Sequence, residues 1–390
     1  MATTTIVSGV QYSGIWSLAG QANAKALTTW PAQPTPKLFT VGLNNAGALG
    51  LGDTVDRSVF TQVGSLTNWS QVNAAYIFSA AVNTNGNLLT WGANYKGPLG
   101  LGNTTYYSSP KQVGSLTSWL YVGGAYRRTT AIKTDGTLWN WGRNDDGELG
   151  LGNTTSYSSP KQVGALTTWY KIASTTMASH TVAIKTDGTL WTWGSNSQGQ
   201  LGLNTAPSYS SPKQVGSWTT WANISANGIN TYAIKTDGTL WSWGGNFSGQ
   251  LGLGTSGAGT YRSSPVQIGA LTTWAYVQGG NQCAIALKTD GTLWTWGANG
   301  FGQLGLGNTT NYSSPKQIGA LTSWSSISGA ASSIFASKTD GTLWSWGRNN
   351  YGQLGLGNTT SYSSPKQVGV LTSWLYISAS NYNVMGIANV

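Results

Sequence analysis

The stretch that decides the fold is KTDGTLWTWGSNSQGQLGL, residues 185–203. Asp187-Gly188 predicts a tight hairpin turn, because glycine tolerates the positive φ that a primed turn requires. Leu190 to Gly194, LWTWG, predicts a strand, because aromatic side chains are enriched in strands. The stretch therefore predicts two antiparallel strands that meet at an Asp-Gly turn.

The same pattern recurs along the chain about 50 residues apart. Its Leu-Gly-Leu-Gly string, or a near copy, begins at Leu49, Leu99, Leu149, Leu201, Leu251, Leu304 and Leu354. Within the repeat at 169–216 we expect further strands at 170–173, 181–185 and 212–215. No segment of it has the i, i+3, i+4, i+7 apolar spacing of a helical solenoid. Four short strands per unit are typical of a propeller blade. The sequence therefore predicts an all-β, seven-bladed β-propeller of four-stranded antiparallel blades.

The two ends of the chain supply one blade between them. Residues 383–390 align with the second strand of a blade, and no third strand follows. Leu38 to Gly42, LFTVG, aligns with the missing LWTWG strand. We expect the N-terminal strand to pair with the C-terminal strands, because closure removes the exposed sheet edges. The predicted organisation is a leader over 1–36 and a propeller over 37–390.

The amino-acid composition further narrows the class of protein. Charged residues are 8% of 390, against about 25% in ordinary domains, and aromatic residues are 12%, which argues against disorder. The 54 Gly, 21 Trp and few charges indicate a turn-rich all-β protein. One cysteine, Cys283, excludes a disulfide scaffold, and no apolar run is long enough for a transmembrane helix. The chain has one histidine, His180, and one glutamate, Glu148. It therefore lacks most of the residues that a catalytic triad or a metal site requires. We expect no enzyme, no cofactor and no metal. The charge of +10 comes largely from one lysine per outer strand, so we expect no specific nucleic-acid binding.

The repeat at 185–203 resembles that of the regulator of chromosome condensation family, a seven-bladed propeller. Gly52-Asp53 with Arg57 resembles the family's Gly-Asp…Arg…Pro loop, and Arg262 begins another such copy. The resemblance covers about residues 38–390. It implies a rigid disc that presents loops to a protein, as in the family's guanine-nucleotide exchange factor and in a bacterial inhibitor of β-lactamases. We find no inserted loop to act as a nucleotide-displacing wedge, which puts exchange activity in doubt.

The leader differs from the blades. Residues 11–31 run from Tyr-Ser-Gly-Ile-Trp to Thr-Trp-Pro and resemble the leader of bacteriophage structural proteins. A short helix is expected over 18–27, capped by Ser17, followed by a stiff proline linker. There is no signal peptide. The resemblance implies a virion protein, oligomeric in its assembly, that contacts other virion proteins through residues 1–36. Bacterial cytoplasm and extracellular space are the alternative locations.

An antiparallel meander places the loops after its first and third strands on one face. The inner loops of this face differ in every copy, whereas the Thr-Asp-Gly-Thr turns opposite repeat. Divergent loops on a rigid scaffold commonly bind partners, although drift in unconstrained loops is the alternative. The candidate partner-binding residues are Tyr76, Tyr126, Arg127, Arg128, His180, Asn227, Asn230, Asn281, Gln282, Asn381 and Tyr382.

Tyr126-Arg127-Arg128 is the sharpest local candidate, because tyrosine and arginine are enriched at interface hot spots. The alternative is that these arginines only solubilise the surface. His180, in the longest inner loop, is either a pH-sensitive contact or inert.

The main functional prediction is a non-enzymatic recognition or structural module, serving as a phage decoration, tail or receptor-binding protein. One alternative is a lectin-like propeller that binds cell-surface glycans. Its aromatic ring would be Tyr107, Tyr157, Tyr209, Tyr261, Tyr312 and Tyr362, which could instead pack on adjacent blades. The other alternative is a regulator of a protein partner, either an exchange factor or an enzyme inhibitor.

Overall fold

The computed structural model describes residues 6–7, 10–11, 35–173, 177–330 and 332–390. The chain divides into two compact units, Met1–Thr35 and Pro36–Val390. In the first unit, β1 (Ile6–Val7) pairs antiparallel with β2 (Val10–Gln11). The predicted helix over 18–27 lies outside the described residues, as does nearly all of the leader motif.

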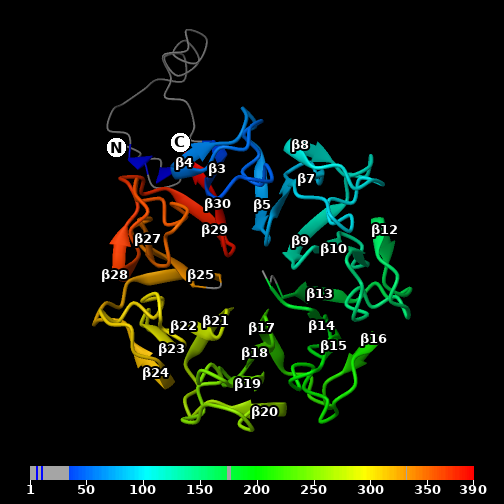
Figure 1. Cartoon of the computed structure of the whole chain (residues 1–390), viewed down its shortest axis with the longest axis vertical. Coiled ribbons are helices and arrows are strands. Elements are labelled where there is room, and N and C mark those ends of the chain that lie inside the picture. Colours follow the sequence, from blue (N-terminus) through cyan, green and yellow to red (C-terminus); the bar gives the residue numbers. More distant parts are fainter. Residues whose placement is uncertain (1–5, 8–9, 12–34, 174–176, 331) are drawn as a thin grey trace, which may run out of the picture. The chain divides into compact units, whose positions relative to one another are not determined.

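The second unit is a ring of seven four-stranded antiparallel sheets, which confirms the predicted propeller (Figure 1). Six blades are continuous in sequence and run from an inner to an outer strand. They are β5 (Trp69–Ala74), β6 (Phe78–Asn83), β7 (Leu88–Gly92), β8 (Tyr107–Gln112); β9 (Trp119–Ala125), β10 (Arg128–Lys133), β11 (Leu138–Gly142), β12 (Tyr157–Gln162); β13 (Trp169–Ile172), β14 (His180–Lys185), β15 (Leu190–Gly194), β16 (Tyr209–Gln214); β17 (Trp221–Asn227), β18 (Asn230–Lys235), β19 (Leu240–Gly244), β20 (Arg262–Gln267); β21 (Trp274–Gly280), β22 (Cys283–Lys288), β23 (Leu293–Gly297), β24 (Tyr312–Gln317); β25 (Trp324–Ala330), β26 (Ser333–Lys338), β27 (Leu343–Gly347) and β28 (Tyr362–Gln367).

The seventh blade is composite, as predicted. It consists of β29 (Trp374–Ala379), β30 (Asn383–Asn389), β3 (Pro36–Gly42) and β4 (Arg57–Gln62). Strand β3 pairs antiparallel with β30 over its whole length, from Pro36 opposite Asn389 to Gly42 opposite Asn383. Both ends of the propeller unit are therefore held in one sheet.

The outer strands begin earlier than the sequence suggested. We expected the fourth strand of the 169–216 repeat at 212–215, but β16 spans Tyr209–Gln214 and includes Pro212. Its pairing with β15 shifts register between Thr192 and Gly194. Proline is accommodated there because an outermost strand has a free edge, where a missing N–H removes no ladder bond.

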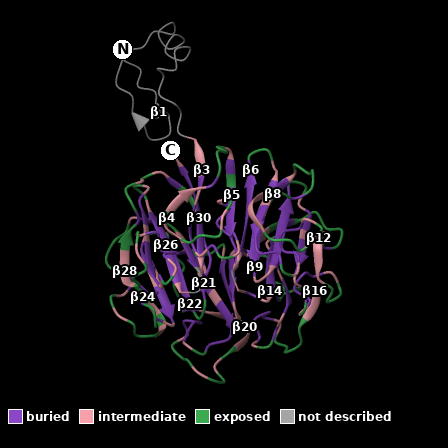
Figure 2. Ribbon diagram, turned by 45° about the horizontal axis from the view of Figure 1, so that its top comes forward, coloured by how far each residue is buried: buried purple, intermediate pink, exposed green. Residues whose placement is uncertain are grey.

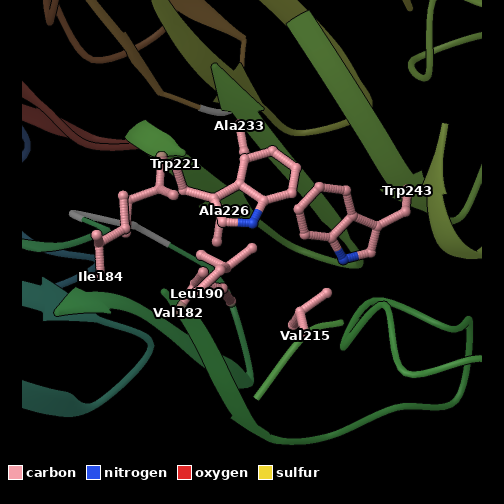
Figure 3. Packing of buried hydrophobic residues seen from close by; sticks show 10 residues of the cluster. Val182, Ile184, Leu190, Val215, Trp221, Ala226, Ala233 and Trp243 are labelled. Carbon is pink, nitrogen blue, oxygen red and sulfur yellow. The ribbon is translucent and has the colours of Figure 1, made fainter. Parts of the chain in front are cut away.

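The core lies between neighbouring blades. Figure 3 shows one such layer, in which Trp221 and Trp243 pack with Val182, Leu190 and Val215 of the preceding blade. The second tryptophan of the LWTWG motif is fully buried in each of six blades. Its indole N–H donates to a backbone carbonyl of the preceding blade, as from Trp243 to Gln200 at 2.9 Å. This confirms that one tryptophan of each pair belongs to the inter-blade core.

Asp-Gly turns close the opposite end of five blades, and Asn85-Gly86 takes their place between β6 and β7. In the turn after β14, the Asp187 carboxylate accepts hydrogen bonds from the amide and hydroxyl of Thr189 at 2.9 and 2.6 Å. The Lys185 ammonium lies 3.6 Å from the ring centroid of Trp191, a cation–π contact. Buried strands and exposed loops are seen together in Figure 2.

Candidate functional site

Two sets of loops share one face of the propeller, which we call the upper face. The inner set follows the first strand of each blade and the outer set follows the third. The inner loops are 75–77, 126–127, 173–179, 228–229, 281–282, 331–332 and 380–382, and residues 174–176 and 331 lie outside the described part. The Asp-Gly turns and the connections between blades form the lower face.

Four tyrosines from the upper loops form a continuous row. Tyr126 contacts Tyr76 with ring centroids 5.0 Å apart, and Tyr76 contacts Tyr382 at 5.2 Å. Tyr382 then contacts Tyr351 at 5.6 Å. All three pairs meet edge to face, the favoured geometry for aromatic rings. The hydroxyls of Tyr76 and Tyr382 lie 3.4 Å apart, and this hydrogen bond is the main cause that raises the pKa of Tyr76 to about 12.

An arginine stacks at each end of this row. The Arg127 guanidinium carbon lies 4.8 Å from the ring centroid of Tyr95 and 4.9 Å from that of Tyr126. The Arg348 guanidinium carbon lies 5.2 Å from the centroid of Phe301 and 5.9 Å from that of Tyr351. We name the whole row the tyrosine–arginine arc. In spatial order its members are Phe301, Arg348, Tyr351, Tyr382, Tyr76, Tyr126, Arg127 and Tyr95.

A buried asparagine in each outer loop explains how the arc is held. Asn94 accepts a hydrogen bond from the Leu99 amide at 3.0 Å and donates to the Asn103 carbonyl at 2.9 Å. Gly97, at φ +81°, passes so close to Ser158 of the next blade that a Cβ would lie 2.5 Å from its Cα. The backbone is therefore fixed at Asn94 and Gly97, on both sides of residues 95 and 96.

Most acidic groups near the arc are already paired. Arg143, which lies 5.4 Å from the Tyr126 ring centroid, pairs with Asp145 at 2.8 Å and Asp146 at 3.5 Å. Lys96 adds a 3.7 Å contact to Asp145. Within the described residues, neither Arg127 nor Arg348 forms an ion pair, and the Nε atom of each is buried without a hydrogen-bond partner.

The structure places four predicted residues in the arc: Tyr76, Tyr126, Arg127 and Tyr382. Asn281 and Gln282 are exposed on the upper face, and Gln282 accepts a hydrogen bond from Ser248 at 2.8 Å. Asn381 is largely buried against Met177, whose sulfur lies 2.7 Å from its amide nitrogen. These last three residues are not members of the arc.

The predicted partner-binding roles of Arg128 and His180 are wrong. Each begins a second strand and points between blades, so neither is available to a partner. The Arg128 guanidinium donates to the carbonyls of Ala178 and His180, and burial lowers its pKa to about 10. His180 is fully buried with Nε2 2.8 Å from the Thr231 hydroxyl. Burial, helped by Arg128, lowers the pKa of His180 to about 3, so the predicted pH-sensitive partner contact is wrong.

The predicted partner-binding roles of Asn227 and Asn230 are also wrong. They flank the tight turn at Gly228, and both side chains are buried. The Asn227 amide donates to the Gly279 carbonyl of the next blade at 2.9 Å. The Asn230 amide donates to the Gly245 carbonyl. Their amides satisfy backbone carbonyls and are not presented to a partner.

Sequence reasoning missed the outer-loop half of the arc. Tyr95 and Phe301 are 50% and 44% exposed, and Phe247, outside the arc, is 50% exposed. A signal was present: the two positions after the recurring Gly-x-Asn differ in every repeat, while the residues around them recur. These pairs are Asn45-Ala46, Tyr95-Lys96, Asp145-Asp146, Ser197-Gln198, Phe247-Ser248, Gly300-Phe301 and Asn350-Tyr351.

The aromatic ring expected for glycans is interrupted and partly covered. The Tyr107 hydroxyl accepts a hydrogen bond from Asn103 at 3.5 Å, and Lys111 lies 5.5 Å from its ring centroid. Both partners belong to the same blade as Tyr107, not to the adjacent one. Tyr261 does not occupy the equivalent position, because Arg262 pairs with Gly244 where Tyr209 pairs with Gly194.

The described residues contain no group of three His, Cys, Asp or Glu that could hold a metal. Burial raises the pKa of the Cys283 thiol to about 12, so it is protonated at neutral pH. No helix in the described part of the chain is long and apolar enough to cross a membrane.

Comparison with known proteins agrees with this architecture. The RCC1-like domain family matches residues 125–385, and the regulator of chromosome condensation (RCC1) repeat matches residues 85–132. The chain therefore belongs to the RCC1-like domain family.

A curated relative is the human probable E3 ubiquitin-protein ligase HERC6, 30% identical over 135 residues. The match covers 33% of this chain and 13% of that protein, so the chain spans only about an eighth of its relative.

Two solved structures share the fold. Human WBSCR16 has 20% identity and a TM-score of 0.81, covering 91% of this chain and 99% of that one. Yeast RCC1 (Prp20), solved with Kap60, has 16% identity and a TM-score of 0.82, covering 99% and 96%.

Proposed function

We propose that this chain is a non-enzymatic module that regulates or recruits a partner protein through its upper face. The observation that carries the proposal is the tyrosine–arginine arc. It joins loops of several blades into one row of the side chains most enriched at binding hot spots. A rigid ring supports these loops, so little ordering entropy is lost on binding.

The relatives support a protein partner. Prp20p of Saccharomyces cerevisiae, at 18% identity and a TM-score of 0.79 over 92% of each chain, was studied for its binding to Gsp1p and histones. Yeast RCC1 (Prp20) has also been solved bound to Kap60, a further protein. A shared fold does not identify the partner here, but it supports a partner of the same class.

The other predicted functions have less support. The virion role rests on residues 1–36, and nothing in the propeller or in the relatives above bears on it. Glycan stacking requires an open aromatic face, whereas Arg127 lies over both Tyr95 and Tyr126. Protein binding is the function that the arc supports best.

Site-specific photocrosslinking tests the proposal. A benzoylphenylalanine in place of Tyr95 reports on the upper face, and one in place of Leu116 reports on the lower face. Both parent side chains are about half exposed, at 50% and 48%, which makes them a matched pair. In cells of the source organism we expect a defined protein adduct from position 95 only. An adduct from position 116 alone would contradict the proposed function.

A further inference from the structure

We infer that the arc recognises an acidic segment of its partner, with carboxylates bound by Arg127 and Arg348 at the two ends of the tyrosine row. This inference rests on the proposed function and specifies the chemistry of the partner. No residue of the chain supplies these two arginines with a carboxylate in the described structure.

Arg127 is held ready for such a ligand. Its backbone adopts a left-handed φ of 59°, and its carbonyl accepts the Arg143 amide at 2.9 Å, which fixes the turn. Two tyrosine rings, 4.8 and 4.9 Å from the guanidinium carbon, restrict the side chain. A planar guanidinium in a fixed orientation binds a carboxylate with two parallel hydrogen bonds.

Arg348 has the same arrangement, and no acidic residue follows it in the sequence. Phe301 and Tyr351 stack on it, as Tyr95 and Tyr126 stack on Arg127. Asp340 and Asp290, the nearest acidic residues before it in sequence, lie in lower-face turns, and residues 341–390 contain no Asp or Glu. The charge of Arg348 is therefore not neutralised by its own blade.

The tyrosines between the arginines suit a peptide. They offer apolar ring surface, and the hydroxyl of Tyr76, whose pKa is raised, remains a neutral hydrogen-bond donor or acceptor. Tyrosine combines both properties at a small entropic cost, which is why it is common in protein-binding surfaces. The arrangement fits a segment with acidic ends and an apolar or aromatic middle.

A continuous polyanion fits less well. Arg127 and Arg348 lie at opposite ends of the tyrosine row, so they do not form the continuous basic stripe that closely spaced phosphates require. Five lysines of the lower turns are stacked on tryptophans, and five more on outer strands lie over tyrosines, so they do not join the arc in one patch. These are Lys133, Lys185, Lys235, Lys288, Lys338, Lys111, Lys161, Lys213, Lys316 and Lys366.

Panning a random dodecapeptide library tests the inference. The full chain is the bait, and a Tyr126→Ala/Tyr382→Ala variant removes peptides that bind elsewhere. We expect the arc-dependent peptides to be enriched in Asp and Glu. Replacing these acids by Asn and Gln should weaken binding by about tenfold or more, as should Arg127→Gln or Arg348→Gln.

Arg262→Gln is the matched control. Arg262 begins β20 directly after an upper-face loop, but its guanidinium donates to the Thr260 and Tyr261 carbonyls at 3.2 and 3.0 Å, so the affinity should not change. Arc-dependent peptides without acidic residues would overturn the inference and leave the proposed function standing. A library with no arc-dependent peptide would overturn both. Oligouridylate binding that depends on Arg127 and Arg348, and exceeds peptide binding, would assign a nucleic acid instead.

Discussion

A single glycine in most repeats determines how closely neighbouring blades approach. Gly202, at φ +71°, lies where an added Cβ would be 2.7 Å from the indole nitrogen of Trp243. That nitrogen donates to the carbonyl of Gln200, so the glycine and the inter-blade hydrogen bond form one unit. The composite blade is an exception, because the corresponding Gly355 lies against Phe60.

Gly202→Ala should destabilise the ring more than Gly216→Ala does. Both glycines have a positive φ, of 71° and 60°, but nothing lies within 4 Å of a Cβ at Gly216. We predict about 1–2 kcal/mol from left-handed strain at Gly216. At Gly202 displacement of the Trp243 hydrogen bond should raise the loss to about 3 kcal/mol. Urea unfolding measures both, and equal losses would show that the indole contact is unimportant.

His180 makes stability depend on pH. It is the one histidine of the chain, and its folded pKa of about 3 lies below the value of about 6.5 expected when unfolded. The unfolded state therefore binds the proton first, so stability is full above pH 6.5 and falls as the pH decreases. Between pH 7 and 5 we predict a loss of about 2 kcal/mol.

His180→Gln is the corresponding variant. It removes the titrating group, so its unfolding free energy should change little over the same pH interval, whatever its absolute stability. Few other side chains titrate in this range, since aspartate and glutamate ordinarily have lower pKa values and no other histidine is present. An equal slope in both proteins would show that His180 is not the source.

At the scale of elements, the repetition of the sequence made the number and order of the strands predictable. The exact ends of the outer strands were not predictable from it. The Asp-Gly turns and the LWTWG strands recur with little change, so their positions agree with the structure. The predicted outer strand begins too late, at Pro212, whereas β16 begins at Tyr209. Strand order followed from the closure of the ring at Leu38 to Gly42.

The candidate site was only half predictable for a physical reason. Loop residues and the first strand residues look alike in sequence, but they point in different directions. Arg127 remains in the turn, while Arg128 begins β10 and is buried between blades. Tyr95 and Tyr351 join the arc through contacts with the inner-loop residues Arg127 and Tyr382, which no single repeat reveals.

Strand β3 should be indispensable, whereas the unit before it should not. A chain that begins at Pro36 keeps the pairing of β3 with β30, so its unfolding should remain cooperative with a similar melting temperature. A chain that begins at Leu43 loses this pairing and exposes two sheet edges, so we expect aggregation or loss of the transition. Calorimetry distinguishes them, and a stable ring without β3 would contradict the closure.

At the scale of the whole molecule, the ring separates stability from recognition. Buried tryptophans and glycines repeat from blade to blade, while the exposed residues of the upper loops differ. The composition that makes the protein rich in Trp and Gly thus belongs to the scaffold. The net charge of +10 is dispersed over lysines stacked on aromatic rings, and the two arginines of the arc have no acidic partner in the described part of the chain.

The most direct test compares the affinity of the crosslinked partner for two double variants. Tyr126→Ala/Tyr382→Ala disrupts the arc, and Leu116→Ser/Leu166→Ser alters two lower-face residues that are 48% and 47% exposed. By isothermal titration we predict a dissociation constant about a hundredfold higher for the arc variant and unchanged for the lower-face variant. An unchanged constant for the arc variant, or a loss confined to the lower-face variant, would contradict the assignment of the upper face as the binding surface.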